Sequence, residues 1–222
     1  MKRIDLTDVT CVIAASLILV MTILSTMSTD RTPYKLWTGV LCSFFCLLPM
    51  LFRHANLMRL PLVLVLPIVV TIFLHAYGVL LILYDDIVWY DTVTHLAASI
   101  TIALLVFYAL VAIEMFDKET RFGKRLPLFV TLIMMTFSIY WEVLELAVDF
   151  TTGINMQYSP WDTIRDMVCN TIGTLMVTIP LRFYLKRHDP YEFIQRLEMG
   201  PSLKRIVAHE RKKSKQPVNE DR

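Results

Sequence analysis

The chain has 222 residues, of which 55% are hydrophobic, and its mean hydropathy is +0.53. This composition excludes an ordinary soluble domain, whose surface does not tolerate so much apolar area. The formal net charge of +2 gives no general affinity for nucleic acid, and the six glycines are too scattered to form a phosphate-binding loop. We therefore interpret the chain as an integral membrane protein.

Six apolar runs follow one another, each close to the ~20 residues that cross the hydrocarbon core of a bilayer. They cover residues 9–27, 35–52, 60–83, 92–113, 127–148 and 163–185. The first run lacks a signal cleavage site, so we expect it to be retained as a span. The sequence predicts an all-α, polytopic fold: a bundle of six transmembrane helices over residues 1–187, followed by a basic tail over residues 188–222.

Basic residues gather on one side of these runs. They are Lys2, Arg3, Arg53, Arg59, Lys118, Arg121, Lys124, Arg125, Arg182, Lys186 and Arg187. The opposite connections hold Asp30, Arg31 and Lys35, then Asp85, Asp86 and Asp91, and then residues 149–162, which contain no Lys or Arg. By the positive-inside rule, both termini are predicted to be cytoplasmic in a multi-pass protein of the plasma or inner membrane. The tail is expected to be a solvated end, with association to the membrane surface as the alternative.

Polar residues interrupt the last three runs. Asp91 and His95 begin the fourth run, Glu142, Glu145 and Asp149 end the fifth, and Asp162, Asp166 and Asn170 begin the sixth. Within each run the spacing of three or four places these side chains on one helical face. Ionisable groups at membrane depth are costly and indicate a functional site. We expect the three faces to meet near the outer surface of the membrane.

Several carboxylates packed together must be protonated or neutralised by a cation. Carboxylate, imidazole and amide ligands suit Mg, Mn, Ca or Zn, so we predict a divalent metal site, with a proton relay as the alternative. The expected metal ligands are Glu142, Glu145, Asp149, Asp162, Asp166 and Asn170. His95 would be a ligand or a general base oriented by Asp91, and Arg165 would clamp a phosphate. Asp162 is alternatively the N-cap of its helix, and His75 is expected to bond to a neighbouring helix.

Three motifs carry a resemblance to known families. They are residues 89–95 (WYDTVTH), 141–145 (WEVLE) and 162–166 (DTIRD), the last followed by Asn170 and Gly173. Over residues 80–179 the chain resembles the YjdF-like family of uncharacterised inner-membrane proteins and, more distantly, the VanZ-like family. The resemblance implies a helical membrane fold with the acidic and His residues gathered at one end.

Three functions are compatible with this pattern. The first is a metal-dependent hydrolase or transferase that acts on a lipid head group entering from the membrane. The second is a structural or sensing membrane protein, and the third is a proton- or cation-coupled carrier. The inner halves of the spans hold few matching polar residues, which disfavours a carrier. Residues 150–161 are expected to form a short lid or to anchor the chain at the membrane interface with their aromatic side chains.

Overall fold

The computed structural model describes residues 5–27, 32–116, 121–153, 156–157, 159–188 and 198–199. Its six long helices are α1 (Leu6–Thr26), α2 (Thr32–His54), α3 (Leu62–Leu80), α5 (Tyr90–Phe116), α6 (Leu126–Thr152) and α7 (Pro160–Tyr184). A short helix, α4 (Leu83–Asp86), and a 3₁₀ turn, η1 (Gly123–Arg125), lie in two of the connections. The prediction of a helical bundle is confirmed, and each predicted run coincides with one long helix to within a few residues.

Five of the described helices, α1, α2, α3, α5 and α6, are long and apolar enough to cross a membrane. The sixth, α7, is as long as these but carries Asp162, Arg165, Asp166 and Asn170 in its first half. Helices of this length and hydropathy fit the ~30 Å hydrocarbon core. The chain is therefore an integral membrane protein by composition and by structure, with five helices that meet these requirements.

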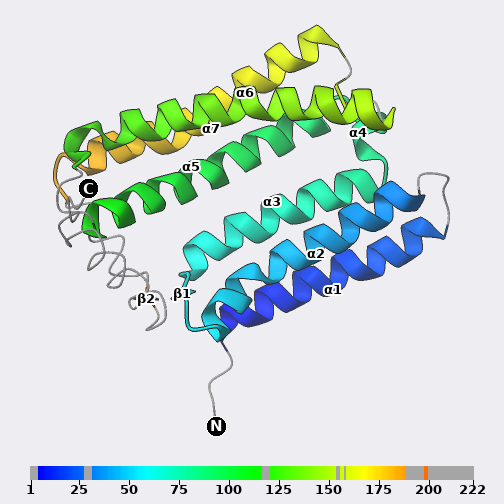
Figure 1. Cartoon of the computed structure of the whole chain (residues 1–222), viewed down its shortest axis with the longest axis horizontal. Coiled ribbons are helices and arrows are strands. Elements are labelled where there is room, and N and C mark those ends of the chain that lie inside the picture. The colour runs from blue at the N-terminus through cyan, green and yellow to red at the C-terminus, as the bar shows by residue number, and fades with distance from the viewer. Residues whose placement is uncertain are drawn as a thin grey trace, which may run out of the picture.

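The long helices form two groups of three, a first trio of α1, α2 and α3 and a second trio of α5, α6 and α7 (Figure 1). Each trio has its own apolar core, with Ile18 and Val65 buried in the first and Phe107 and Val111 buried in the second. Helices α3 and α5 join the trios through polar contacts as well as packing. The Oγ1 atoms of Thr71 and Thr101 are 2.8 Å apart, and the Tyr90 hydroxyl donates to the carbonyl oxygen of Leu74 at 2.6 Å.

Local signals in the sequence explain where α6 and α7 stop and start. Helix α6 ends at Gly153, which adopts the left-handed conformation (φ 68°) that glycine reaches without strain. Helix α7 begins after Ser159, whose hydroxyl accepts a hydrogen bond from the backbone N–H of Asp162 at 3.2 Å. Ser159 is therefore the N-cap, and the alternative assignment of that role to Asp162 is wrong. The cap leaves the Asp162 carboxylate available to other groups.

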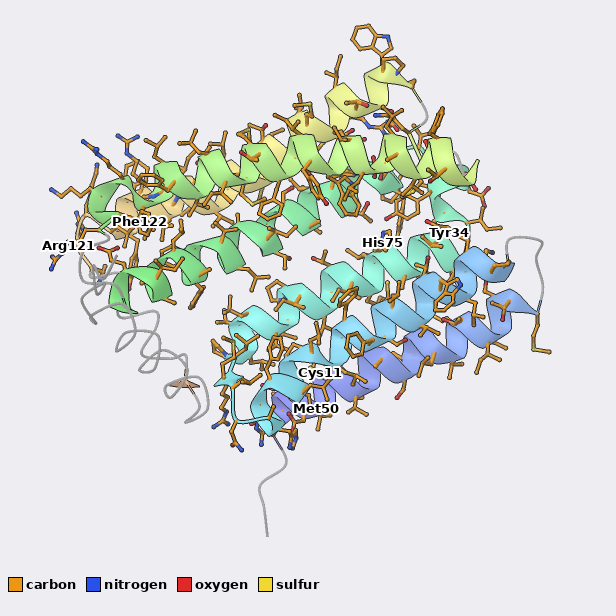
Figure 2. All side chains as sticks on the ribbon, viewed as in Figure 1. Cys11, Tyr34, Met50, His75, Arg121 and Phe122 are labelled. Carbon is orange, nitrogen blue, oxygen red and sulfur yellow. The ribbon has the colours of Figure 1, made fainter. Side chains whose placement is uncertain are left out.

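The bundle has two distinct ends. We call the end that carries α4 and the α6–α7 connection the site end; Tyr34 and His75 lie toward it, while Arg121 and Phe122 lie at the opposite end (Figure 2). At the opposite end the two-residue strands β1 (Met58–Arg59) and β2 (Glu198–Met199) pair antiparallel. Apart from β2 and residue 188, the predicted basic tail lies outside the described residues, as do Lys2, Arg3, Lys118 and Tyr158.

Candidate functional site

The first turns of α5 supply two of the predicted site residues. Asp91 and His95 are four residues apart and therefore lie on one face of the helix. The Nε2 atom of His95 is 3.4 Å from Oδ1 of Asp91. The imidazole is buried, and the carboxylate is half-buried at the start of the helix. The Asp91 carboxylate therefore lies beside the imidazole on the same face of α5.

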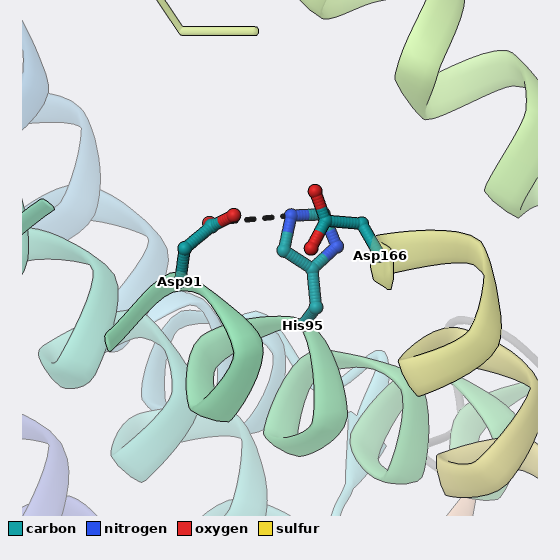
Figure 3. A group of neighbouring side chains, drawn as sticks. All are labelled: Asp91, His95 and Asp166. Atoms are coloured by element: carbon teal, nitrogen blue, oxygen red, sulfur yellow. Dashed lines mark ion pairs between the residues drawn. The ribbon is translucent and has the colours of Figure 1, made fainter. Parts of the chain in front are cut away.

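Helix α7 brings Asp166 to the same place. One ligand atom from each of Asp91, His95 and Asp166 lies within 4.8 Å of the other two (Figure 3). Asp166 is only 1% exposed, so its carboxylate is held away from water. Two carboxylates and an imidazole at this separation can bind one metal ion after small side-chain movements. Among the described residues, this is the group that could hold a metal.

Helix α6 adds two buried glutamates beside this group. Oε1 of Glu145 lies 3.9 Å from Nε2 of His95 and accepts a hydrogen bond from Nε1 of Trp141 at 2.7 Å. Glu142 is close enough to interact with the charge of His95. Within the described part of the chain, neither Glu142 carboxylate oxygen has a hydrogen-bond partner. Buried oxygens without a partner are costly, and the side chain of Thr163 is the neighbouring group that can interact with the Glu142 carboxylate.

Arg165 lies at the rim of the site and contacts three carboxylates. It pairs with Asp162 one turn before it, and its Nη2 atom is 3.5 Å from Oδ2 of Asp91. Its Nε atom is 3.7 Å from Oδ1 of Asp166, an oxygen with no hydrogen-bond partner in the described structure. The Arg165 side chain is 37% exposed. It therefore offsets part of the negative charge and keeps one side toward the surroundings.

The site carries more acids than bases. The carboxylates of Asp91, Glu142, Glu145, Asp162 and Asp166 face the guanidinium of Arg165 and the imidazole of His95. Even with a charged imidazole, five acids outnumber two bases. Desolvated like charges cannot all remain ionised without a counter-charge. The arrangement therefore requires bound protons or a bound cation.

Two predicted ligands are used differently. Asn170 accepts a hydrogen bond from Ser99 Oγ (2.6 Å) and donates one to Ser138 Oγ (3.0 Å), so it ties α7 to α5 and α6. Asp149 accepts hydrogen bonds from the backbone N–H groups of Met156 (2.6 Å) and Gln157 (2.8 Å). The structure thus does not bring these two side chains into the Asp91–His95–Asp166 group; they hold the helices and the α6–α7 connection in place.

Part of the α6–α7 connection packs beside the site. Met156 lines the cavity next to the site, and Gln157 hydrogen-bonds to Thr163. In contrast, the side chains of Phe150 and Trp161 are 91% and 78% exposed. Their exposure fits the expected role as interfacial anchors better than contact with a bound substrate.

A cavity of about 620 Å³ lies between the two trios and reaches the site. His95 and Glu145 line it on one side, and Lys35 and His75 line it on the other. Nδ1 of His75 is 3.0 Å from the hydroxyl of Tyr84 in α4, so its partner comes from the short helix after α3 and not from another long helix. Lys35 is 1% exposed. Lys35 stands at the edge of an apolar run, where a lysine usually faces water, so the sequence does not predict its burial.

The comparisons with known proteins concern the same part of the chain. No curated protein and no solved structure matches it. A family model covers all the site residues and the six long helices, except for the first turn of α1. Since this model, described as "Predicted membrane protein (DUF2238)", matches residues 10–187, the chain belongs to that family of membrane proteins.

Proposed function

We propose that this protein is a metal-dependent hydrolase or transferase that acts on the phosphate of a lipid head group. The observation that carries the proposal is the convergence of the half-buried Asp91 with the buried His95 and Asp166 from two helices, within a site whose acids outnumber its bases. A divalent cation would neutralise two of the excess charges at once. Mg, Mn, Ca and Zn all accept carboxylate oxygens, and the imidazole favours Mn or Zn among them.

Each residue has a role in this proposal. Asp91, Asp166 and His95 would be the inner ligands, and Glu142, whose oxygens have no partner in the described structure, would complete the metal site. Glu145 lies 3.9 Å from the imidazole and would accept a proton from the attacking water. The bound ion would polarise a phosphoryl oxygen and lower the pKa of that water.

Arg165 would orient the phosphate. Its guanidinium already touches the carboxylates of Asp91 and Asp162, and more than a third of the side chain remains exposed. An incoming phosphate could therefore reach the exposed edge of the guanidinium without breaking both pairs. In a hydrolase, water would form the new P–O bond while the bond to the leaving group breaks. In a transferase, an acceptor hydroxyl would replace the water.

We further propose that α7 is the sixth span. Its polar residues Asp162, Asp166 and Asn170 are buried, whereas Ile164, Val168, Ile172, Met176 and Ile179 form an exposed apolar face. Such a helix is apolar toward lipid and polar toward its neighbours, which lowers its average hydropathy without preventing a span. Six spans place both termini on the same side of the membrane.

The orientation follows from the distribution of charge. Arg53, Arg59, Arg121, Lys124 and Arg125 lie at the end opposite the site, which supports cytoplasmic termini and a site near the outer head-group layer. We propose the plasma or inner membrane as its location. We also propose a relationship to the YjdF-like family and, more distantly, to the VanZ-like family, on the sequence motifs of residues 89–95 and 141–145, whose helices form this site.

A metal that only fastens helices is the second candidate, because the three ligands would join α5 to α7. The test measures metal content and phosphate release together. Wild-type protein, purified in detergent after expression with Mg, Mn and Zn, is expected to hold about one divalent ion per chain, and His95→Ala is expected to lose it. Wild type, but not His95→Ala, should release phosphate or transfer it from a panel of phospholipids in vesicles.

The outcomes separate the candidates. Metal without turnover on any lipid, together with a large loss of thermal stability in His95→Ala, would favour the structural or sensing role. Wild-type protein that holds no stoichiometric divalent ion would contradict the proposal and favour a protonated carboxylate network. Size-exclusion profiles of both proteins serve as the control for folding.

A further inference from the structure

We infer that the cavity between the two trios binds a hydrocarbon chain of a phospholipid, which enters from the membrane between α2 and α6. The inference rests on the proposed function for the place of the head group and adds where the chain lies and how it enters. The cavity volume of about 620 Å³ is in the range of sites that enclose small organic ligands. Its walls come from both trios, so it is a feature of the assembled bundle.

The lining of the cavity changes from polar to apolar along the bundle. Toward the site end it is lined by Lys35, His75, Tyr84, His95 and Glu145. Further from the site end, the lining is mostly apolar, with Thr71 and Ser138 among residues such as Cys42, Phe45, Ile72, Ile102, Met134 and Phe137. A phospholipid has the same order of a charged head followed by an apolar chain. The lining of the cavity therefore changes from polar to apolar in the same order as one leaflet of a membrane.

The length of the cavity fits this assignment. Its lining on α5 runs from Thr94 to Ile102, and on α6 from Glu145 back to Met134. At 1.5 Å per residue these stretches are about 12 and 16 Å long. Half of the hydrocarbon core is about 15 Å thick. A chain with its head group at the site would thus reach about to the middle of the bilayer.

The entrance is on the side that faces lipid. Leu41 and Phe45 of α2 and Phe137 and Trp141 of α6 line the cavity, and each is also between 43% and 49% exposed. Helices α2 and α6 belong to different trios, and the main packing between the trios is made by α3 and α5 instead. The opening is therefore bordered by large apolar side chains. This border suits a hydrocarbon chain that moves in sideways without leaving the apolar layer.

The charges at the head-group end favour one class of phospholipid. The Nζ atom of Lys35 is buried there and lies 3.3 Å from the carbonyl oxygen of Leu80. The carboxylates of Asp85 and Glu145 belong to the same end of the lining. An ammonium group and carboxylates together complement a head group that carries both a phosphate and an amine. The occupant we infer is therefore a zwitterionic phospholipid of the phosphatidylethanolamine type.

The test counts bound lipid. Delipidated protein in a maltoside detergent is titrated with dioctanoyl phosphatidylethanolamine, and native mass spectrometry measures the lipid bound per chain. Wild type is expected to bind one molecule saturably. Ile102→Trp places a larger side chain in the apolar part of the cavity and is expected to weaken binding at least about ten-fold. Leu132→Trp, on α6 but outside the lining and 54% exposed, is the matched control and should bind like wild type.

A second measurement needs no variant. Cys42 lines the cavity, whereas Cys11, Cys46 and Cys169 do not. Bound lipid is expected to slow the modification of Cys42 by a small apolar thiosulfonate reagent at least about five-fold and to leave the other three thiols unchanged. Absence of saturable binding by wild type, equal binding by Ile102→Trp, or absence of protection at Cys42 would overturn the inference.

Metal content measured in the same samples distinguishes this inference from the proposed function. Ile102 is seven residues from His95, about 10 Å along α5, so Ile102→Trp is expected to keep the metal. Lipid binding without any metal in wild type would support the chain site and contradict the metal centre. Metal and turnover with no lipid protection of Cys42 would support the metal centre and contradict the chain site.

Discussion

Two clusters of acids and bases lie at opposite ends of this bundle, and they differ in charge and exposure. At the N-terminal end, Arg53 pairs with Asp5 and Asp8 at 2.8 Å, and Arg59 pairs with Asp5 at 2.7 Å. His54 lies 3.0 Å from Asp8. The two acids are matched by two arginines and a histidine, and the side chains of Arg53 and Arg59 are 28% and 49% exposed. This cluster fastens α1 to α2 and to β1 at the edge of the membrane.

The cluster at the site end has the opposite balance. Asp166, Glu142 and Glu145 are buried, and Arg165 and His95 are too few to neutralise the acids around them. Matched pairs near water are satisfied by the protein itself, and each contributes little to stability. An unmatched buried set is stable only when something else supplies charge. The comparison therefore supports the proposed chemistry at the site end and a fastening role for the cluster at the other end.

The largest expected effect tests whether the two clusters differ in metal binding. Asp166→Asn removes one charge from the unmatched cluster and should lower the affinity for a divalent ion by about 100-fold or more, because even indirect ligand support is worth 10- to 100-fold. Asp8→Asn removes one charge from the matched cluster and should leave the metal affinity unchanged. Competition with a metal-responsive chelator dye measures both. Equal losses in the two variants would contradict the functional difference between the clusters.

The sequence predicted the elements of the site better than their roles. The spacing of Asp91, His95 and Asp166 was sufficient to place each on an inward face, because helical periodicity fixes direction within one helix. The spacing could not show that Asn170 hydrogen-bonds to two serines, because Ser99 and Ser138 lie 71 and 32 residues away in the sequence. Asp149 was also ambiguous, because its partners are backbone N–H groups, which every loop possesses.

The fold was predictable to a similar depth. Six apolar runs gave six long helices, but the division into two trios and the cavity between them depend on contacts between distant segments. Gly173 illustrates the limit. A Cβ atom there would lie 2.9 Å from both the carbonyl oxygen of Leu96 and Cβ of Ser99, so this glycine permits the close approach of α5 and α7. In the sequence, Gly173 only follows the third motif, and nothing there indicates which helix it approaches.

Gly173→Val tests how strongly the site depends on that approach. The added side chain would push α7 away from α5 and is expected to destabilise the protein by about 1–3 kcal/mol, the usual cost of overpacking. The metal affinity should fall as well, because Asp166 lies two turns before Gly173 on the same face of α7 and would also move away from Asp91 and His95 on α5. Thermal unfolding with and without metal measures both effects. Ile172→Val, at a neighbouring position that is 48% exposed, is the control.

Ser159→Ala is expected to have a smaller effect at the start of α7. The variant loses the hydroxyl that accepts from the N–H of Asp162, which costs about 1 kcal/mol for a typical N-cap. Hydrogen exchange should quicken in the first turn of α7 and remain unchanged in α5. Ser159→Asp can still accept that hydrogen bond and should exchange like wild type. Unchanged exchange in Ser159→Ala would show that packing alone positions Asp162 and Arg165.

The smallest expected effect concerns the matched cluster, which is the N-terminal group of Asp5, Asp8, Arg53, His54 and Arg59. Burial raises the pKa of Asp5, but the hydrogen bond from Thr7 and the charges of Arg53 and Arg59 outweigh it and hold the pKa below 3.8. The carboxylate therefore stabilises the fold fully above pH 3.8, and this contribution is lost as the pH falls through the lower pKa of the folded state.

Asp5→Asn should remove this acid-dependent part of the unfolding free energy while retaining the cap on α1, because asparagine also caps helices well. The difference from wild type should be below about 1 kcal/mol at pH 6, as for other pairs near water, and should shrink as the pH falls through the lowered pKa of Asp5. Denaturant titrations at pH 6 and at a series of acidic pH values measure it. A difference that persists undiminished in acid would mean that asparagine does not replace the cap, and that Asp5 holds α1 by accepting the hydrogen bond from the N–H of Thr7 more than by ion pairing.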